Sequence, residues 1–139
     1  MMRLKQEFDS SQRYNIVAVG IFNIDGKSIS KYITGLINWS KLIQYKLPDY
    51  KLRVYYDDSI TEILDLKIKL EEYDNAQFVK CECDDFKTSS GHENYFGLLF
   101  RLLALFDSKT CRNVIVRDIE MSDQDYNRLL NANFNYFAK

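Results

Sequence analysis

Acidic residues follow a β-branched run near residue 118 of this chain. The segment NVIVRDIEMSDQD, residues 113 to 125, is apolar up to Val116 and then supplies Asp118 and Glu120. Carboxylate oxygens are hard ligands that suit Mg²⁺ or Mn²⁺, and the oxygens of a diphosphate would complete the coordination shell of such an ion. The pattern therefore indicates a divalent-metal site at the end of a strand.

Two other apolar runs also end in polar side chains. Asn23 and Asp25 follow the run YNIVAVGIF, and Asp57 and Asp58 follow KLRVYY. The carboxyl ends of parallel strands share one edge of a sheet, and ligands of open α/β sheets bind at that edge. We therefore expect these side chains and the carboxylate pair to meet along one edge of a sheet.

A purely structural interpretation of the same residues stays open. Acids often follow strands, cap helices or lie in solvent, and a single Asp-x-Glu pair has many false positives as a metal motif. Asp58 and Ser59 are compatible with a simple helix start. Arg101 lies inside the apolar run ENYFGLLFRLLALF and needs a partner, which a structural ion pair would provide.

Several familiar sites are excluded by missing motifs. The chain has no G-x-G-x-x-G after its first strand and no G-x-x-x-x-G-K-[ST], so a glycine loop does not hold a phosphate. The G-x-S-x-G nucleophile elbow is also absent. A zinc site with four ligands would need all three cysteines and the single histidine. We predict reduced thiols, and Mn²⁺ or Mg²⁺ as the cofactor.

The composition is that of one globular domain over residues 1–139. The chain is 46% hydrophobic and 14% aromatic, which suffices for one core. Its formal net charge of −1 gives no electrostatic basis for binding nucleic acid. No apolar run approaches the roughly 20 residues that span a bilayer, and the polar start MMRLKQEFDSSQR is unlike a signal peptide. We therefore expect a cytoplasmic protein without membrane insertion.

Runs with strand character alternate with runs of helical spacing. The expected strands are residues 14 to 22, 51 to 56, 76 to 83 and 112 to 117, and the expected helices are residues 28 to 45, 59 to 73, 93 to 106 and 123 to 131. Ser59 with Glu62 fits a capping box for the second helix, and Ser122 with Asp125 fits an N-cap for the last. The alternation predicts an α/β domain with a Rossmann-like, mostly parallel sheet and helices on both faces.

Three segments of the chain resemble a family of nucleotide-sugar glycosyltransferases of GT-A fold, found notably among large DNA viruses and microbes. The segments are KYITGLINWSKLIQYKLPDYKLRVYYDDSI, FGLLFRLLALFD and NVIVRDIEMSDQD. The corresponding family blocks are K-Y-x-x-G…P-x-[WY]-x-x-R-[VIF]-Y-x-D-x-S, then G-x-x-x-R-[FL]…D, then a strand followed by R-D-x-D-S. The matches keep their order and together span residues 31 to 125, about two thirds of the chain.

The resemblance implies a GT-A-like nucleotide-binding half that binds a nucleotide-diphospho-sugar through a divalent metal. The sugar would pass to a hydroxyl of a glycan or another acceptor. The implied site residues are Asp118 and Glu120 for the metal, and Phe22, Asn23, Asp57, Asp58 and Arg101 for the nucleotide. The family has Asp where Glu120 stands, and the longer side chain would shift the metal. Arg101 would lie under the diphosphate or brace Asp118.

The resemblance also leaves alternatives. Family members usually continue past the metal motif with an acceptor-binding half, whereas about twenty residues follow the motif here. A shortened, non-catalytic domain that serves nucleotide-sugar binding or protein interaction is therefore a second interpretation. A flavodoxin-like binding module unrelated to sugars is a third. Phe134, Tyr136 and Phe137 would be available for a homo-oligomer, and a viral protein would lie in the host cytoplasm.

Overall fold

The computed structural model describes residues 3–23, 29–82 and 95–132. Some features singled out from the sequence lie outside these residues, namely Asp25, Cys83, the loop 84–92 with His92, and the aromatic residues Phe134, Tyr136 and Phe137.

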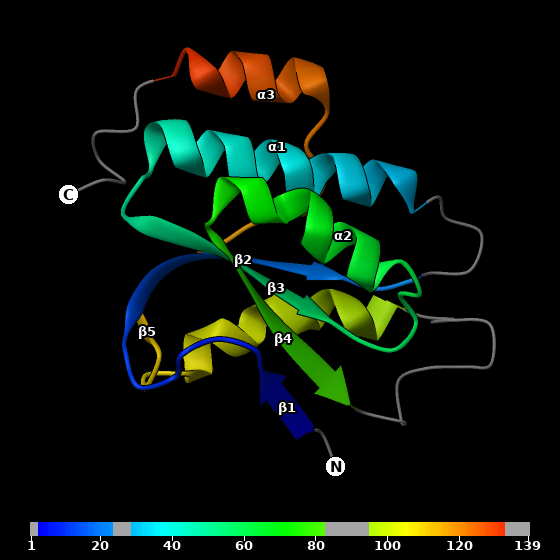
Figure 1. Ribbon diagram of the computed structural model, residues 1–139, viewed down its shortest axis with the longest axis vertical. Helices are drawn as coiled ribbons and strands as arrows, with labels where there is room; N and C mark the ends of the chain where they lie inside the picture. The colour runs from blue at the N-terminus through cyan, green and yellow to red at the C-terminus, as the bar shows by residue number, and fades with distance from the viewer. Residues whose placement is uncertain (1–2, 24–28, 83–94, 133–139) are drawn as a thin grey trace.

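Five strands form one mixed sheet (Figure 1). The strands are β1 (Arg3–Gln6), β2 (Tyr14–Ile21), β3 (Tyr50–Tyr56), β4 (Ala76–Glu82) and β5 (Cys111–Val116). Their order across the sheet is β1-β4-β3-β2-β5, in which β1 alone runs antiparallel to its neighbour. The predicted α/β class with a mostly parallel sheet is thus confirmed.

Helices cover both faces of this sheet. They are α1 (Ser30–Lys46), α2 (Ile63–Leu70), the short 3₁₀ helix η1 (Glu71–Tyr73), the 3₁₀ helix η3 (Tyr95–Phe106) and α3 (Asp123–Leu130). Helix α1 packs against β3, α2 and α3, while η3, yellow in Figure 1, packs against β2, β3 and β5. Successive residues of β2 point to opposite faces of the sheet. Val17 and Val19 belong to the core around α1, and Ile16 and Ala18 belong to the core beside η3.

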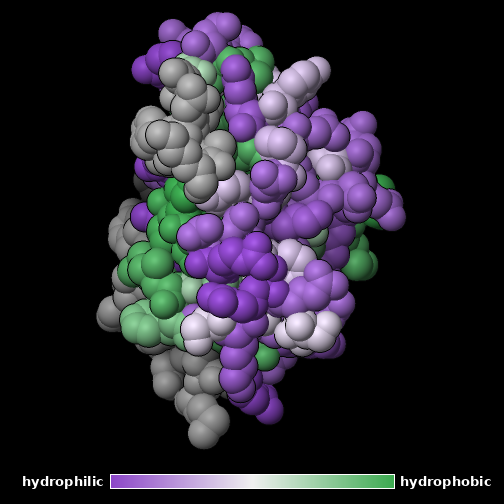
Figure 2. Space-filling view, turned by 90° about the vertical axis from the view of Figure 1, so that its left-hand side faces the viewer, coloured by the Kyte–Doolittle hydropathy of each residue, from purple (hydrophilic) through white to green (hydrophobic). Residues whose placement is uncertain are grey.

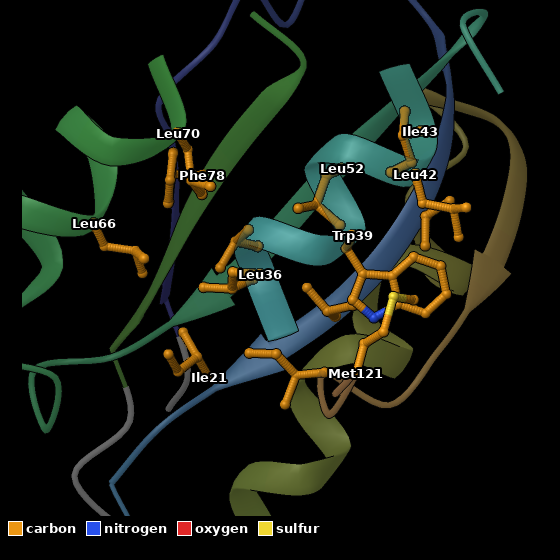
Figure 3. Packing of buried hydrophobic residues seen from close by; sticks show 14 of the residues in the cluster. Ile21, Leu36, Trp39, Leu42, Ile43, Leu52, Leu66, Leu70, Phe78 and Met121 are labelled. Atoms are coloured by element: carbon orange, nitrogen blue, oxygen red, sulfur yellow. The ribbon is translucent and has the colours of Figure 1, made fainter. Parts of the chain in front are cut away.

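Helix α1 is amphipathic and lies directly on the sheet. Leu36, Trp39 and Ile43 recur at helical spacing, and all three are buried. Figure 3 shows them pointing toward the strands, with Met121 beside Trp39. The helix ends at Lys46, ahead of Pro48, whose ring disfavours a helical conformation in the residue before it.

The strand order reverses beside β2. From β2 the chain passes through α1 to β3 and through α2 to β4, and it then returns by way of η3 to β5 on the other side of β2. In open α/β sheets, the usual ligand site lies at the carboxyl ends of the strands, at the point where the connections leave in opposite directions. The pair β2 and β5 marks this point.

Two local predictions were wrong. Strand β1 was not expected, because all four of its residues, RLKQ, are exposed and show no apolar alternation. It is held by pairing with β4 and by Glu7, which accepts hydrogen bonds from Tyr56 and Lys67. The capping box is also absent, since α2 begins at Ile63 and its N-cap residue, Glu62, makes no side-chain capping bond.

Helix η3 is exposed on part of its surface, although the run ENYFGLLFRLLALF that contains it is apolar almost throughout. Three of its large side chains are exposed: Leu102 at 36%, Leu105 at 57% and Phe106 at 85%. Residues three apart lie on one face of a 3₁₀ helix. Arg101 and the buried Ala104 share such a face, and Asp107 follows in the same line. Ala104 is buried and Leu103 packs against the core beside the sheet, whereas Leu102, Leu105 and Phe106 face solvent. The apolar sequence of this helix therefore did not mean burial on every side.

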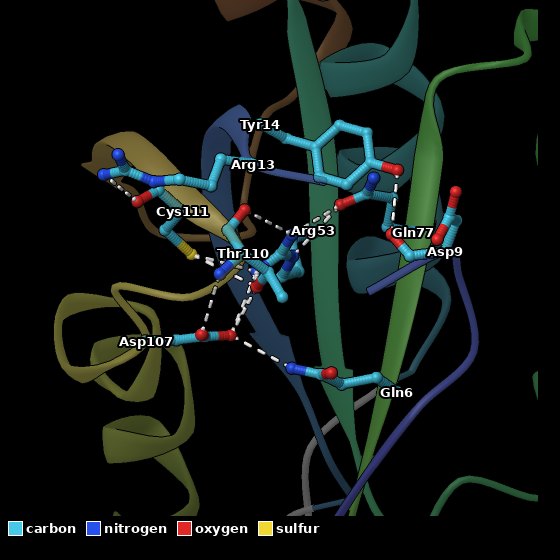
Figure 4. Close-up of polar contacts among 9 residues, drawn as sticks. All are labelled: Gln6, Asp9, Arg13, Tyr14, Arg53, Gln77, Asp107, Thr110 and Cys111. Atoms are coloured by element: carbon cyan, nitrogen blue, oxygen red, sulfur yellow. Dashed lines mark hydrogen bonds and ion pairs between the residues drawn. The ribbon is translucent and has the colours of Figure 1, made fainter. Parts of the chain in front are cut away.

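A buried arginine on β3 connects β3 and β4 with the segment between η3 and β5 (Figure 4). Arg53 is 0% exposed, and its Nε and NH2 groups donate to Gln77 Oε1 at 3.1 and 2.8 Å. Its NH1 group donates to Thr110 Oγ1 at 2.8 Å and lies 3.5 Å from Asp107 Oδ2. The guanidinium lies 4.3 Å from the ring centre of Phe8, so the N-terminal segment closes over it.

None of the helices within residues 3–23, 29–82 and 95–132 has the length and apolar character needed to cross a bilayer.

Candidate functional site

The polar strand ends lie along one edge of the sheet, as expected. Asn23 follows β2, Asp58 follows β3, and the segment 117–120 follows β5. Because β5 pairs with β2 in parallel, and the Arg117 N–H donates to the Ala18 carbonyl at 3.0 Å, this segment runs beside the end of β2. The parallel pairing of the strands is therefore the cause of the convergence.

The loop that carries the carboxylate pair is seated on α1 through its backbone. A Cβ atom on Gly35 would lie 1.9 Å from the carbonyl oxygen of Ile119. Trp39 Nε1 donates to the Asp118 carbonyl at 3.0 Å, and Asn38 Nδ2 donates to the Met121 carbonyl at 2.9 Å. Main-chain contacts thus hold the loop, and the acidic side chains are left at the surface.

Each carboxylate of the pair faces one cation. Arg101 NH1 lies 3.8 Å from Asp118 Oδ1, and Lys31 Nζ lies 3.4 Å from Glu120 Oε1. The side chains of Asp118 and Glu120 are 67% and 45% exposed. Arg101 comes from η3 and Lys31 from α1, so the loop lies between cations from the two faces of the sheet. Arg101 pairs with Asp118, which is one of the two roles that the resemblance implied for it. Lys31 was not identified from the sequence as a site residue.

A hollow of about 460 Å³ opens beside Glu120, between the N-terminal ends of α1 and α3. Lys31 and Thr34 line it on one side, and Glu120, Asp123 and Asp125 on the other. The predicted N-cap of α3 is confirmed at its rim, where Ser122 Oγ accepts from the Asp125 N–H at 3.1 Å. The sequence did not indicate this hollow, because its two walls are far apart along the chain.

Asp57 is buried, and its carboxylate positions Ser59 and, through Ser59, the backbone of Asn23. It is 3% exposed, and its Oδ1 accepts from the Ser59 N–H at 3.0 Å and from the Ser59 hydroxyl at 2.5 Å. Ser59 Oγ in turn accepts from the Asn23 N–H at 2.8 Å. Asp57 therefore fixes a turn that joins the ends of β2 and β3. Phe22 is likewise buried, at 3%, in the core beside η3.

Asp58 is the acid that this turn presents to solvent. Its side chain is 57% exposed and lies 2.8 Å from Lys80 Nζ at the end of β4. The hydrogen bond and the negative charge of Asp58 raise the pKa of Lys80 above its usual value, so Lys80 stays protonated near neutral pH. Ion pairs thus lie at both ends of the edge, at β5 and at β3 and β4, with Asn23 between them at the end of β2.

Removing the Ser59 hydroxyl should loosen the turn between β2 and β3. In Ser59→Ala the Asp57 carboxylate and the Asn23 N–H both lose a partner, so we expect a loss of about 1 to 2 kcal/mol of unfolding free energy. Urea denaturation measures this loss. Thr61→Ala, at an exposed position nearby, is the matched control and should change stability by less than about 0.5 kcal/mol. Equal stability of the two variants would show that the turn does not need this hydroxyl.

The donor atoms suit a hard cation. The part of the chain that the structure describes contains no group of three or more His, Cys, Asp or Glu side chains arranged around a common point. A hard cation held by Asp118 and Glu120 would have to take its remaining ligands from phosphate or water, as Mg²⁺ commonly does. Cys81 and Cys111 are buried free thiols, as predicted, and lie in the core beside η3.

Comparison with protein-family models, with curated proteins and with solved structures finds no match to this chain.

Proposed function

We propose that the domain binds a nucleotide-diphospho-sugar through Mn²⁺ or Mg²⁺ at the edge between β2 and β5, and passes the sugar to an acceptor hydroxyl. One observation carries the proposal: the three segments that resemble GT-A glycosyltransferases pack on one another there. Gly35 of the first segment lies against Ile119 of the third. Arg101 of the second pairs with Asp118 of the third.

The edge carries both acidic and basic side chains, which suits a metal cation bound together with a phosphate anion. A purely acidic cluster favours a bare cation, and a purely basic patch favours a bare anion. Here Asp118 and Glu120 offer oxygen ligands to a metal, while Arg101 and Lys31 offer N–H donors to phosphate oxygens. A metal ion bound there would stabilise the negative charge that develops on the departing nucleoside diphosphate.

The nucleoside would extend along the edge toward β3. The turn held by Asp57 and Ser59 sets the backbone of Asn23, which lies between the carboxylate loop and Asp58. Asp58 is an exposed acceptor at the end of β3. Acids in this position of doubly wound folds accept hydrogen bonds from ribose hydroxyls, and we assign Asp58 that role.

A thermal-shift panel of nucleoside diphosphates and their sugars, with and without Mn²⁺, tests the proposal. At 100 times its dissociation constant, the matching ligand should add roughly 2.7 kcal/mol of stability, and only with the metal present. Asp118→Asn should abolish this gain. Its stability without ligand should change by less than about 0.5 kcal/mol, because the side chain is 67% exposed.

Asp49→Asn removes one negative charge from an exposed position away from the edge and serves as the control. It should keep the full ligand response. Unchanged melting temperatures across the whole panel would refute nucleotide binding, and an Asp118→Asn variant that responds like the parent would place the site elsewhere.

Protein interaction is a second candidate, within a non-catalytic domain or in a homo-oligomer. It is favoured by the exposed apolar side chains Leu102, Leu105 and Phe106 near the end of η3. Figure 2 shows a face of the molecule on which hydrophobic residues gather along the margins of a hydrophilic centre. Exposed apolar groups that lie together are typical of interaction surfaces. The solution mass, measured by light scattering for the parent and for Phe106→Ser, tests this candidate.

A further inference from the structure

The two cations at the carboxylate loop make weak contacts. Lys31 lies 3.4 Å from Glu120, and Arg101 lies 3.8 Å from Asp118, which are long distances for charge-assisted hydrogen bonds. The side chain of Lys31 is 60% exposed and that of Arg101 is 28% exposed. Exposed pairs of this kind are worth at most about 1 kcal/mol, so either cation can change partner at little cost.

The loop does not depend on these ion pairs for its position. Its backbone lies against Gly35 and is held by hydrogen bonds from Trp39 and Asn38. Breaking an ion pair therefore leaves Asp118 and Glu120 in place. The backbone of Asp118 and Glu120 is held in place, whereas the cations at the ends of their long side chains can change partner.

The cations also flank the carboxylates from opposite sides of the sheet. Lys31 stands in the first turn of α1, at the rim of the 460 Å³ hollow, and Arg101 projects from η3. A metal on the two carboxylates would compete with both cations for the negative charge of Asp118 and Glu120. A diphosphate bound to that metal would instead attract both.

We infer that Lys31 and Arg101 are exchangeable counter-ions: they neutralise Glu120 and Asp118 in the ligand-free domain and transfer to the phosphate oxygens when metal and diphosphate bind together. The inference rests on the proposed function and adds a role for Lys31 and an order of events to it. Metal alone binds weakly because it must displace two cations. Metal with diphosphate binds tightly because the displaced cations gain new partners.

This exchange predicts opposite effects of one substitution on two ligands. Lys31→Met and Arg101→Met each remove a competitor, so Mn²⁺ alone should bind about two- to fivefold more tightly. Each also removes a phosphate contact, so the Mn²⁺ complex of inorganic pyrophosphate should bind about tenfold more weakly. A residue that merely supports the loop would weaken both ligands together.

The experiment measures free Mn²⁺ by electron paramagnetic resonance and binding of the Mn²⁺–pyrophosphate complex by calorimetry, on the full chain. Lys69→Met and Arg112→Met are the matched controls, because each removes one exposed positive charge elsewhere on the surface. They report the effect of net charge alone, and thermal unfolding confirms that every variant is folded.

Opposite shifts in the Lys31 and Arg101 variants that exceed those of the controls would support the exchange. If both ligands weaken together, or if neither affinity changes, the exchange is wrong while the proposed function stands. If the parent binds neither Mn²⁺ nor its pyrophosphate complex, the proposed function fails and the exchange fails with it.

Discussion

Replacing Arg53 by methionine is expected to lower the unfolding free energy of this domain by about 3 to 5 kcal/mol. The methionine keeps most of the buried apolar stem but removes the guanidinium. Gln77 Oε1 then loses two hydrogen bonds, and the Asp107 carboxylate loses its ion pair. Buried groups that lose their partners carry the full cost of desolvation, which is the reason for the large effect.

The partners of Arg53 make the prediction specific. Asp107 also accepts a hydrogen bond from Gln6 Nε2 at 3.0 Å, so its carboxylate ties the β1 segment to the same network. Urea denaturation of Arg53→Met, Asp107→Asn and the double variant forms a cycle, and the effects should be clearly non-additive. Arg112→Met, at an exposed position of β5, is the control. A loss below about 1 kcal/mol in Arg53→Met would show that the network contributes little.

Replacing Gly35 by valine should damage the fold and the site together. A Cβ atom at this position would lie 1.9 Å from Ile119 O and 3.2 Å from Met121 N, and both are backbone atoms that cannot rotate away. Either α1 or the carboxylate loop must move. Overpacking of this kind costs typically about 1 to 3 kcal/mol, and we expect the upper end because the contact is with backbone.

The same substitution should also weaken Mn²⁺ and nucleotide binding, since Asp118 and Glu120 are carried by the loop that moves. Thermal unfolding measures the first effect, and the Mn²⁺-dependent thermal shift measures the second. Gln44→Ala, at an exposed position of α1, should alter neither. A stable Gly35→Val variant that responds to ligand like the parent would mean that α1 and the loop are less closely packed than the structure indicates.

The sequence by itself determined the elements whose pattern is local. The β-branched runs of β2, β3 and β5 and the helical spacing in α1 are properties of neighbouring residues, and so is the N-cap at Ser122. Parallel strands follow from the alternation of these elements. The meeting of Asn23, Asp58 and Asp118 at one edge follows in turn, because parallel strands end on the same side.

The apolar composition of the 93–106 run was not sufficient to predict its environment. Its apolar side chains favour burial, but the sequence does not specify which of them pack against the sheet. The tertiary structure leaves Leu105 and Phe106 exposed, buries Ala104 and pairs Arg101 with Asp118 in the loop after β5. Strand β1 was missed for the complementary reason, since an exposed edge strand is specified by the backbone groups of β4 and not by its own side chains.

Only the tertiary structure decided which polar side chains face a ligand and which face the core. Asp57 and Asp58 are neighbours of the same type, yet Asp57 is buried against Ser59 and Asp58 lies in solvent beside Lys80. Lys31 likewise meets Glu120 from a distant part of the chain. A side chain's partner depends on the packing of separate elements, and contacts between distant segments form only once the sheet and its helices have assembled, so no local pattern encodes them.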